Sequence, residues 1–229
     1  MTLNRRQLAQ ATALLALPGL GLDAFAQRAK DSLVLGMVLE PSPGLDPTMA
    51  AAAAIGEVVH YNILEGLTKI TDSGAVLPLL ATDWTSDPDG RSYTFKLRGG
   101  VKFQDGSPFN AEAVKFSFER AKAPASTNKA KKTVFENISS IATPSPDTVI
   151  LTLTNPDATL PFRLGESTAV ILSPKSAETT ATQPVGTGPF RLDSWQKGSA
   201  ITLVRWDGFR DVAAIKLKRV SFRFISDNA

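Results

Sequence analysis

An almost continuous run of apolar residues spans residues 31–39, with the sequence DSLVLGMVL. A run of this kind is typical of a β-strand that is buried on both faces. Pro41, Pro43 and Gly44 follow it and end the strand, because proline and glycine favour turns. The pattern therefore predicts a buried strand near the start of the folded part of the chain.

Over residues 50–67 the apolar residues have the spacing of a helix. Ile55, Val59 and Ile63 recur at every fourth position, which places their side chains on one face of a helix. Gly66 lies close to the end of this segment, where a glycine commonly terminates a helix. The spacing predicts an α-helix that packs through this one face.

Residues 79–121 predict a hairpin followed by a helix. The stretch DPDG at residues 87–90 fits a type I turn, since proline presets φ at the second position and glycine suits the fourth. The apolar side chains of the next segment alternate with polar ones, which predicts a strand with one buried face. These alternating residues are Tyr93, Phe95 and Leu97.

A second turn at Asp105-Gly106 leads to a predicted helix in the same segment. Asn110 precedes the helix and has the side chain of a typical N-cap residue. Val114, Phe118 and Ala121 form its apolar stripe. Each of these residues fits a turn, cap or core position, so the segment indicates fold rather than chemistry.

The remaining chain alternates short strands with polar connections. Residues 122–132 are polar and predict a loose loop. Apolar or alternating patterns then predict strands at residues 148–154, 169–172, 191–195, 199–206 and 218–225. Strands outnumber helices and the two types are interspersed, so we expect a mixed α/β (α+β) domain.

The first 26 residues have the features of an export signal. Arg5 and Arg6 precede an apolar run over residues 8–22, and Ala24-Phe25-Ala26 provides the small residues that signal peptidase needs. We expect cleavage after Ala26. The arginine pair favours Tat export, although Sec signals also carry two arginines. The run is shorter than the about 20 residues that a membrane-spanning helix needs.

Composition narrows the classes of function. The chain has no cysteine, which excludes disulfides, thiolate metal sites and a cysteine nucleophile. The formal net charge of the chain is +3. Residues 1–26 contain two arginines and one aspartate, a net charge of +1, so the exported part carries +2. Lys129, Lys131 and Lys132 form a local basic cluster without interleaved aromatic residues, which indicates a solvated loop rather than a nucleic-acid site.

The sequence contains few candidate catalytic residues and no recognisable catalytic motif. His60 is the one histidine, and a lone histidine is more often a packing or surface residue than a metal ligand. No G-x-S-x-G segment occurs, and Gly186-Thr187-Gly188 lacks the lysine of a P-loop. We therefore expect no catalytic residue, no metal site and no cofactor.

Four segments, in order, resemble the peptide/nickel-type extracellular solute-binding proteins (family 5). They are Leu45-Asp46-Pro47, Glu65-Gly66-Leu67, the stretch from Leu79 to Ala121, and Pro184 to Phe190. Each short segment is weakly specific, but four in order over most of residues 31–229 are a specific pattern. The resemblance is interrupted at residues 206–209, where WDGF stands in place of the usual asparagine-proline and tyrosine-tryptophan.

The resemblance implies a periplasmic binding protein-like fold of type II. It implies a lobe I core formed by residues 27–50 and 165–229, with an inserted subdomain at residues 51–164. The segment FISDNA at the end of the sequence resembles the crossing point into a second lobe. We therefore expect lobe I with its subdomain, without the second lobe.

The resemblance also implies function. Such a protein is the periplasmic substrate-binding component of an ABC importer, and it binds a peptide or a similar small solute between two lobes that close. Its partners would be the solute and the permease subunits of the inner membrane, and it would act as a monomer without catalysis. Two alternatives stay open: a non-transporting sensor or truncated remnant of the same fold, and, as the weakest, a secreted hydrolase.

Two segments are candidates for contacts with the ligand. Glu40, Pro41 and Ser42 follow the first predicted strand, where a peptide could add as a further strand through main-chain hydrogen bonds. Gly186, Thr187 and Gly188 form the second candidate, because two glycines let a backbone approach a ligand closely. The alternatives are a solvated strand end for Glu40 and a tight strand connection for the glycine segment.

Overall fold

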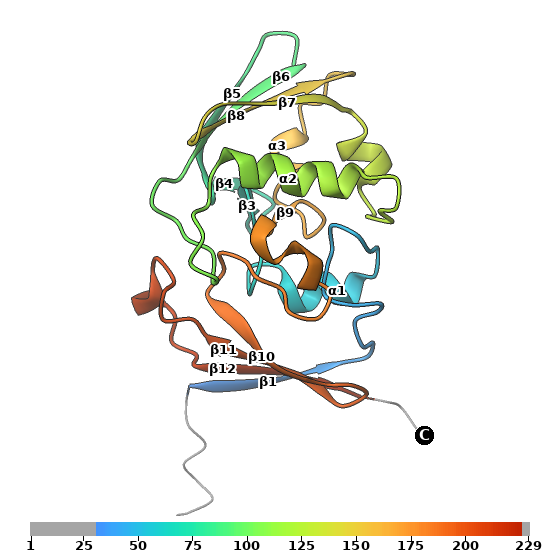
Figure 1. The fold of residues 1–229 in the computed structure, drawn as a ribbon, viewed down its shortest axis with the longest axis vertical. Helices are drawn as coiled ribbons and strands as arrows, with labels where there is room; N and C mark the ends of the chain where they lie inside the picture. Colours follow the sequence, from blue (N-terminus) through green and yellow to red (C-terminus); the bar gives the residue numbers. More distant parts are fainter. Residues whose placement is uncertain (1–30, 226–229) are drawn as a thin grey trace, which may run out of the picture.

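The computed structural model describes residues 31–225, so the predicted signal peptide at residues 1–26 lies outside the described residues. Two four-stranded sheets lie at opposite ends of the molecule, with the helices between them (Figure 1). None of the described helices has the length and apolar character needed to cross a membrane.

The lower sheet in Figure 1 has the strand order β1-β12-β11-β10. Its strands are β1 (Ser32–Met37), β10 (Phe190–Gln196), β11 (Ala200–Arg205) and β12 (Arg219–Phe224). β1 runs parallel to β12, and the other two pairs are antiparallel. Helix α1 (Ala53–Val59) covers the inner face of this sheet, and their buried apolar side chains form one cluster.

The upper sheet has the strand order β5-β6-β8-β7 and is antiparallel throughout. Its strands are β5 (Ala81–Ser86), β6 (Ser92–Leu97), β7 (Ile138–Ser145) and β8 (Thr148–Leu153). Helix α2 (Ala111–Lys122) lies under it in Figure 1. The remaining short elements are β2 (Glu65–Gly66), β3 (Thr68–Ile70), β4 (Val76–Pro78), the π-helical turn Lys131–Phe135, α3 (Leu160–Arg163), β9 (Val170–Ile171) and the 3-10 helices Pro174–Thr179 and Val212–Ala214.

The predicted hairpin and helix of residues 79–121 are confirmed. The Gly90 amide donates to the Asp87 carbonyl in the first turn, at 3.1 Å. The Asn110 side chain accepts a hydrogen bond from the Ala113 amide at 3.1 Å, and so caps α2. The alternating strand residues and the helix stripe are all buried in one apolar cluster, which contains Tyr93, Phe95, Leu97, Val114, Phe118 and Ala121.

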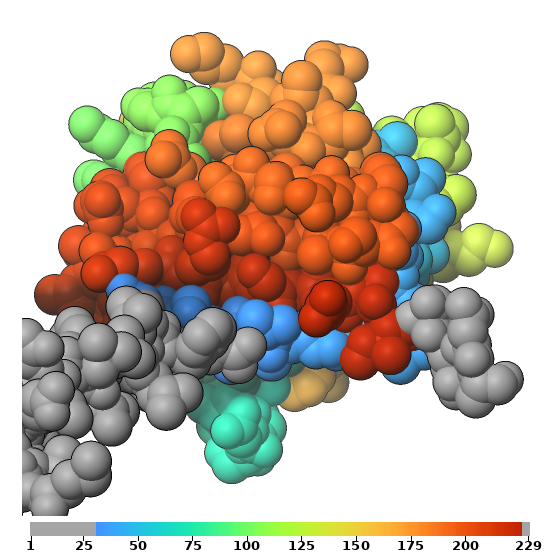
Figure 2. All heavy atoms as spheres, turned by 90° about the horizontal axis from the view of Figure 1, so that it is seen from below, coloured from blue at the N-terminus to red at the C-terminus, as the bar shows by residue number. Residues whose placement is uncertain are grey.

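The prediction that residues 31–39 form a strand is confirmed, but the prediction that both of its faces are buried is wrong. Leu33, Val34 and Leu35 are 41%, 63% and 40% exposed. The reason is position: among the described strands β1 pairs only with β12, so it forms the edge of the sheet. Viewed from below, Figure 2 shows β1 in blue along the border of the red and orange strands. The apolar run therefore belongs to an edge strand.

The helix predicted over residues 50–67 is also shorter than expected. Residues 50–52 precede α1 in a non-helical conformation, with Ala52 at φ −67° and ψ 128°. Beyond the helix, Tyr61 has a φ of 58°, a left-handed conformation that interrupts a right-handed helix. Glu65 then pairs with Ile171 as part of β2. Ile55, Val59 and Ile63 are fully buried, so the apolar positions hold although the helix ends early.

The prediction of a loose loop at residues 122–132 is wrong, because buried polar side chains fix this segment. Asn128 Nδ2 donates to the carbonyls of Pro47, at 2.8 Å, and Thr168, at 2.9 Å. The Ser126 hydroxyl donates to the Thr48 carbonyl at 2.8 Å. Buried polar groups are stable only when they are hydrogen-bonded, and these bonds attach the segment to the chain on both sides of it.

Two ion pairs involve acidic residues of the segments that carry the family resemblance. Buried Asp46 pairs with Arg120 of α2, with 2.9 Å between Oδ2 and Nη2. Buried Glu65 forms a bidentate pair with Arg210, with 2.7 Å on each side. Both carboxylates therefore connect elements that are distant in sequence, which is a structural role.

Asp105 connects the second turn of residues 79–121 to the segment before β10. The hydroxyls of Ser173 and Ser176 donate to Asp105 Oδ2 at 2.6 and 2.8 Å, and Ser107 donates to Oδ1. Burial on its own would raise the pKa of Asp105, but these hydrogen bonds outweigh it and lower the pKa to about 2.

Two apolar clusters correspond to the two sheets. The larger cluster surrounds the upper sheet and α2. The smaller cluster contains the side chains of α1 and the lower sheet, so α1 packs with the lower sheet although its residues lie within the segment expected as an insertion. The division into residues 27–50 with 165–229 and residues 51–164 stays a prediction.

Candidate functional site

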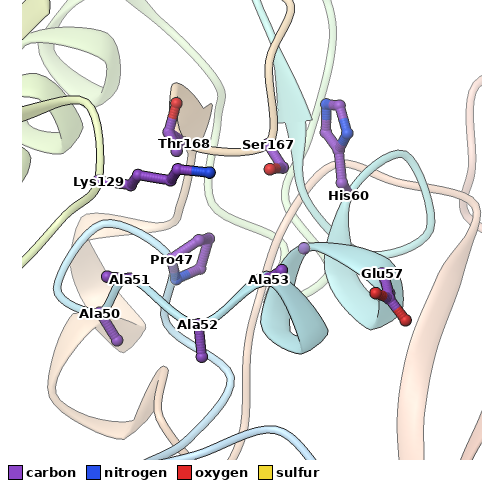
Figure 3. Close-up of a pocket in the computed structure, with 11 residues that line it drawn as sticks. Pro47, Ala50, Ala51, Ala52, Ala53, Glu57, His60, Lys129, Ser167 and Thr168 are labelled. Carbon is purple, nitrogen blue, oxygen red and sulfur yellow. The ribbon is translucent and has the colours of Figure 1, made fainter. Parts of the chain in front are cut away.

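A cavity of about 340 Å³ opens beside the start of α1 (Figure 3), and two other cavities have volumes of about 80 and 90 Å³. It lies among three segments: the chain leading into α1 together with the helix itself, the fixed segment that contains Asn128, and the chain just before β9. The lining residues are Pro47, Ala50–Ala53, Gly56, Glu57, His60, Lys129, Ser167 and Thr168.

One wall of the cavity is bare backbone. Residues 51–53 are exposed and carry only methyl side chains. Among the described residues, the amides of Ala51 and Ala52 and the carbonyls of Ala50 and Ala51 take part in no hydrogen bond. The segment can therefore exchange main-chain hydrogen bonds with an extended ligand.

Alanine at the helix start leaves no polar side chain over this wall. Ala52 occupies the N-cap position of α1, and no side chain caps the helix. Serine, threonine, asparagine or aspartate at this position would bond to the first-turn amides and turn its side chain across them. Ala52 leaves the main chain of the wall accessible.

His60 lies at the far end of α1. Its ring stacks on Tyr61 with 3.7 Å between the ring centroids. Burial lowers the pKa of His60 to about 4, and a hydrogen bond with the Gly165 backbone only partly opposes this effect. The imidazole is therefore neutral at pH 7 and adds no charge to the cavity.

Two side-chain atoms of the cavity residues are buried without a partner. They are His60 Nε2 and Thr168 Oγ1, and among the described residues no other buried side-chain nitrogen or oxygen lacks a hydrogen bond. Such atoms are rare in folded proteins because each costs about 1–3 kcal/mol of stability. Both atoms belong to residues that line this cavity, which singles out the cavity among the described residues.

Charged groups stand at the rim. Figure 3 shows the Lys129 ammonium directed toward Ser167, whereas the carboxylate of Glu57 points away from this space. Both side chains are exposed, and neither belongs to an ion pair among the described residues. The cavity thus combines free main-chain groups with one cation.

This arrangement suits binding better than catalysis. No carboxylate is hydrogen-bonded to His60, so the cavity lacks the oriented base of a hydrolytic site. Over residues 31–225, no group of three or more histidine, aspartate and glutamate side chains could hold a metal ion. Hydroxyls, main-chain groups and an ammonium can instead recognise a small polar solute.

The first predicted contact segment lies elsewhere. Glu40 accepts hydrogen bonds from Trp195 Nε1 at 2.7 Å and from the Gly198 amide at 3.0 Å, and so joins the chain after β1 to the β10–β11 turn. Pro41 is buried and Ser42 is exposed. None of the three lines the cavity. The role of these three residues as ligand contacts stays a prediction. The hydrogen bonds of Glu40 to Trp195 and Gly198 also give this residue a structural role.

The second predicted segment packs inside the fold. A Cβ on Gly186 would lie 2.0 Å from the Ile63 carbonyl oxygen, and one on Gly188 would lie 2.5 Å from that of Asn62. The Thr187 hydroxyl donates to buried Glu65 at 2.8 Å. The glycines therefore allow a close approach of two backbones, and ligand contact by this segment stays a prediction.

The bare wall was missed because a run of five alanines at residues 50–54 fits a helix start. The absence of a capping side chain before α1 was the available indication. Lys129 was assigned to a loose loop, and its position depends on the hydrogen bonds of Asn128 to distant segments, which a local pattern does not reveal.

A comparison with protein families gives the same assignment as the motifs. The model of the bacterial extracellular solute-binding proteins, family 5 (middle region), matches residues 75–229, which is more than half of the chain. The chain belongs to this family. The solute-binding protein also resembles glutathione-binding protein GsiB of Escherichia coli K12, with 32% identity over 188 residues.

Solved structures support the fold. The periplasmic binding protein AgaA of A. tumefaciens R10, in complex with agropinic acid, superimposes with a TM-score of 0.77 and 31% identity over 85% of this chain and 40% of that one. DppA of Helicobacter pylori, in complex with the peptide STSA, gives a TM-score of 0.75 and 30% identity over 85% of this chain and 42% of that one. The expected periplasmic binding protein fold is thereby confirmed.

The match covers only part of these relatives. The aligned region is 80% of this chain but 36% of GsiB. The coverage fits the expectation that residues 31–225 correspond to one lobe of a two-lobed protein. The named relatives are binding proteins, so at the level of the family this chain is a binding protein and not an enzyme.

Proposed function

We propose that this protein is the substrate-binding component of an ABC importer and that the cavity beside α1 is its half of the ligand site. The observation that carries the proposal is the exposed backbone of residues 51–53, with the free amides of Ala51 and Ala52, in the wall of the cavity. An extended solute would add to this backbone like a further strand, and a second lobe would close over it.

The solute we propose is small and derived from amino acids. The names of the similar proteins support this class, since they mention glutathione, agropinic acid and a tetrapeptide. A cavity of about 340 Å³ in an open lobe is large enough for part of such a molecule. Hydrogen bonds to the main chain of Ala51 and Ala52 would not depend on the side chains of the solute, which suits a solute with a peptide-like backbone.

The cellular setting follows from the same proposal. The protein would be exported by the signal at residues 1–26, be cleaved after Ala26, and act as a monomer in the periplasm. It would deliver its solute to permease subunits of the inner membrane. A sensor with the same fold is the second candidate, and uptake of labelled solute by a strain that lacks the gene separates the two.

The test is a binding measurement on the full chain. Calorimetry with reduced glutathione, agropinic acid and the peptide STSA should detect at least one ligand. Failure of all three would contradict the proposed solute class.

A substitution then locates the site. Ala52→Pro removes an amide that has no partner in the fold, and proline tolerates the φ of −67° at this position. We expect binding to weaken about 3- to 10-fold, the worth of one hydrogen bond. Ala52→Gly keeps the amide and is the matched control. Equal affinity of the proline variant and wild type would mean that the ligand lies elsewhere.

A further inference from the structure

Lys129 holds a fixed position at the cavity although its side chain is exposed. Its neighbours Asn128 and Ala130 are buried, with exposures of 4% and 6%. Asn128 Oδ1 accepts from the Ala130 amide at 2.7 Å, and Asn128 Nδ2 bonds to the carbonyls of Pro47 and Thr168 on the other cavity segments. These bonds anchor the backbone of Lys129 between two walls of the cavity.

The side chain of Lys129 extends from this anchored backbone into the space above residues 51–53. Figure 3 shows its ammonium directed toward Ser167. The two other lysines of the local cluster do not line the cavity. Lys131 bonds to the carbonyls of Ala123 and Pro124, and Lys132 is exposed. Lys129 is therefore the one lysine of this cluster that lines the cavity.

No other positive group competes with Lys129 among the residues that line the cavity. His60 is neutral at pH 7, and the Glu57 carboxylate points away from the ammonium. The amides of Ala51 and Ala52 add two further hydrogen-bond donors without partners on the adjoining wall. This side of the cavity therefore presents donors and a positive charge, which together suit an anionic acceptor.

We propose that Lys129 is the specificity-determining residue of this lobe and that it pairs with a free carboxylate of the solute. The inference rests on the proposed function and narrows its solute class to amino-acid derivatives with a carboxylate at the end that lies in this lobe. The ammonium would bind the carboxylate while the rest of the solute follows the backbone of residues 50–53.

The test compares each ligand with its uncharged form. Calorimetry on the full chain pairs STSA with its C-terminal amide, glutathione with its diethyl ester, and agropinic acid with its methyl ester. We expect the neutral forms to bind about 5- to 20-fold more weakly to the wild type, since a hydrogen bond to a charged group is lost. Lys129→Gln should weaken the acid by a similar factor and should remove most of the difference between acid and neutral form.

Two variants serve as controls. Lys132→Gln makes the same change of charge three residues away, outside the cavity lining, and should leave both affinities unchanged within about twofold. Glu57→Gln removes the opposite charge from the lining and should not weaken the acid.

The possible outcomes separate the inference from the proposed function. Equal binding of acid and neutral forms, or equal losses in Lys129→Gln and Lys132→Gln, would overturn the inference while the proposed function stands. Absence of binding by every acid would overturn the proposed function and the inference with it.

Discussion

At the scale of single residues, His60 shows how the properties of a cavity residue depend on its surroundings in the fold. His60 was expected to be a packing or surface residue rather than a metal ligand, and its stacking on Tyr61 and its burial fit the packing alternative. The same residue also lines the cavity, with an unpaired Nε2. A lone histidine in a sequence gives no indication of this second property, because it depends on what surrounds the ring.

His60 should make stability depend on pH. Its folded pKa of about 4 is below the ordinary value of 6.5, so the unfolded chain binds the proton first as pH falls. The full stability is present above about pH 6.5 and is lost as pH falls toward about 4. Between pH 7 and pH 5 we expect the free energy of unfolding to decrease by about 2 kcal/mol from this residue.

Urea unfolding at the two pH values measures this decrease. His60→Gln, which does not titrate, is the matched variant, and its loss between pH 7 and pH 5 should be smaller by about 2 kcal/mol. Equal losses in the two proteins would mean that His60 is not buried as a neutral base.

At the scale of elements, the sequence predicted the elements with a regular local pattern and mispredicted those whose limits depend on distant contacts. The segment of β6 and α2 was correct down to the Asn110 cap, because turn, alternation and cap are all local. The limits of α1 were wrong because Tyr61 and β2 end it through contacts with Gly165 and β9. The exposure of β1 was wrong because an apolar run does not reveal whether a strand lies at the edge of its sheet.

The candidate site divides in the same way. The family motifs were correct as indicators of fold, and their acidic residues Asp46, Glu65 and Asp105 proved to bind other parts of the same chain. The two predicted contact segments lie outside the cavity lining. Both also have partners within the fold, because Glu40 bonds to Trp195 and Thr187 bonds to Glu65. The cavity itself joins segments about 80 and 120 residues apart, so no single stretch of sequence could predict it.

At the scale of the whole molecule, a buried ion pair connects segments that are far apart in the sequence. The Glu65 carboxylate lies between Arg210 and the Thr187 hydroxyl, and so links β2, the glycine segment and the chain after β11. Removal of one partner from a buried pair leaves an uncompensated charge, which costs much more than a surface pair contributes.

Arg210→Met should therefore destabilise the fold by about 3–5 kcal/mol. Arg205→Met is the matched control, because its partner Asp207 is 82% exposed and such pairs contribute about 0–1 kcal/mol. Chemical denaturation measures both. A double variant, Arg210→Met with Glu65→Gln, should recover part of the loss, since the buried charge is then absent. Similar small effects of Arg210→Met and Arg205→Met would contradict the structural role of the Glu65 pair.

The claim that the solute lies along the backbone of residues 50–53 is tested most directly by amide NMR. Spectra of the full chain would be recorded with increasing amounts of the ligand that calorimetry identifies. We expect the amide signals of Ala51 and Ala52 to move downfield and their hydrogen exchange to slow, because each amide gains a hydrogen-bond acceptor. Saturation with the ligand while these two amides keep their shifts and exchange rates would contradict the account.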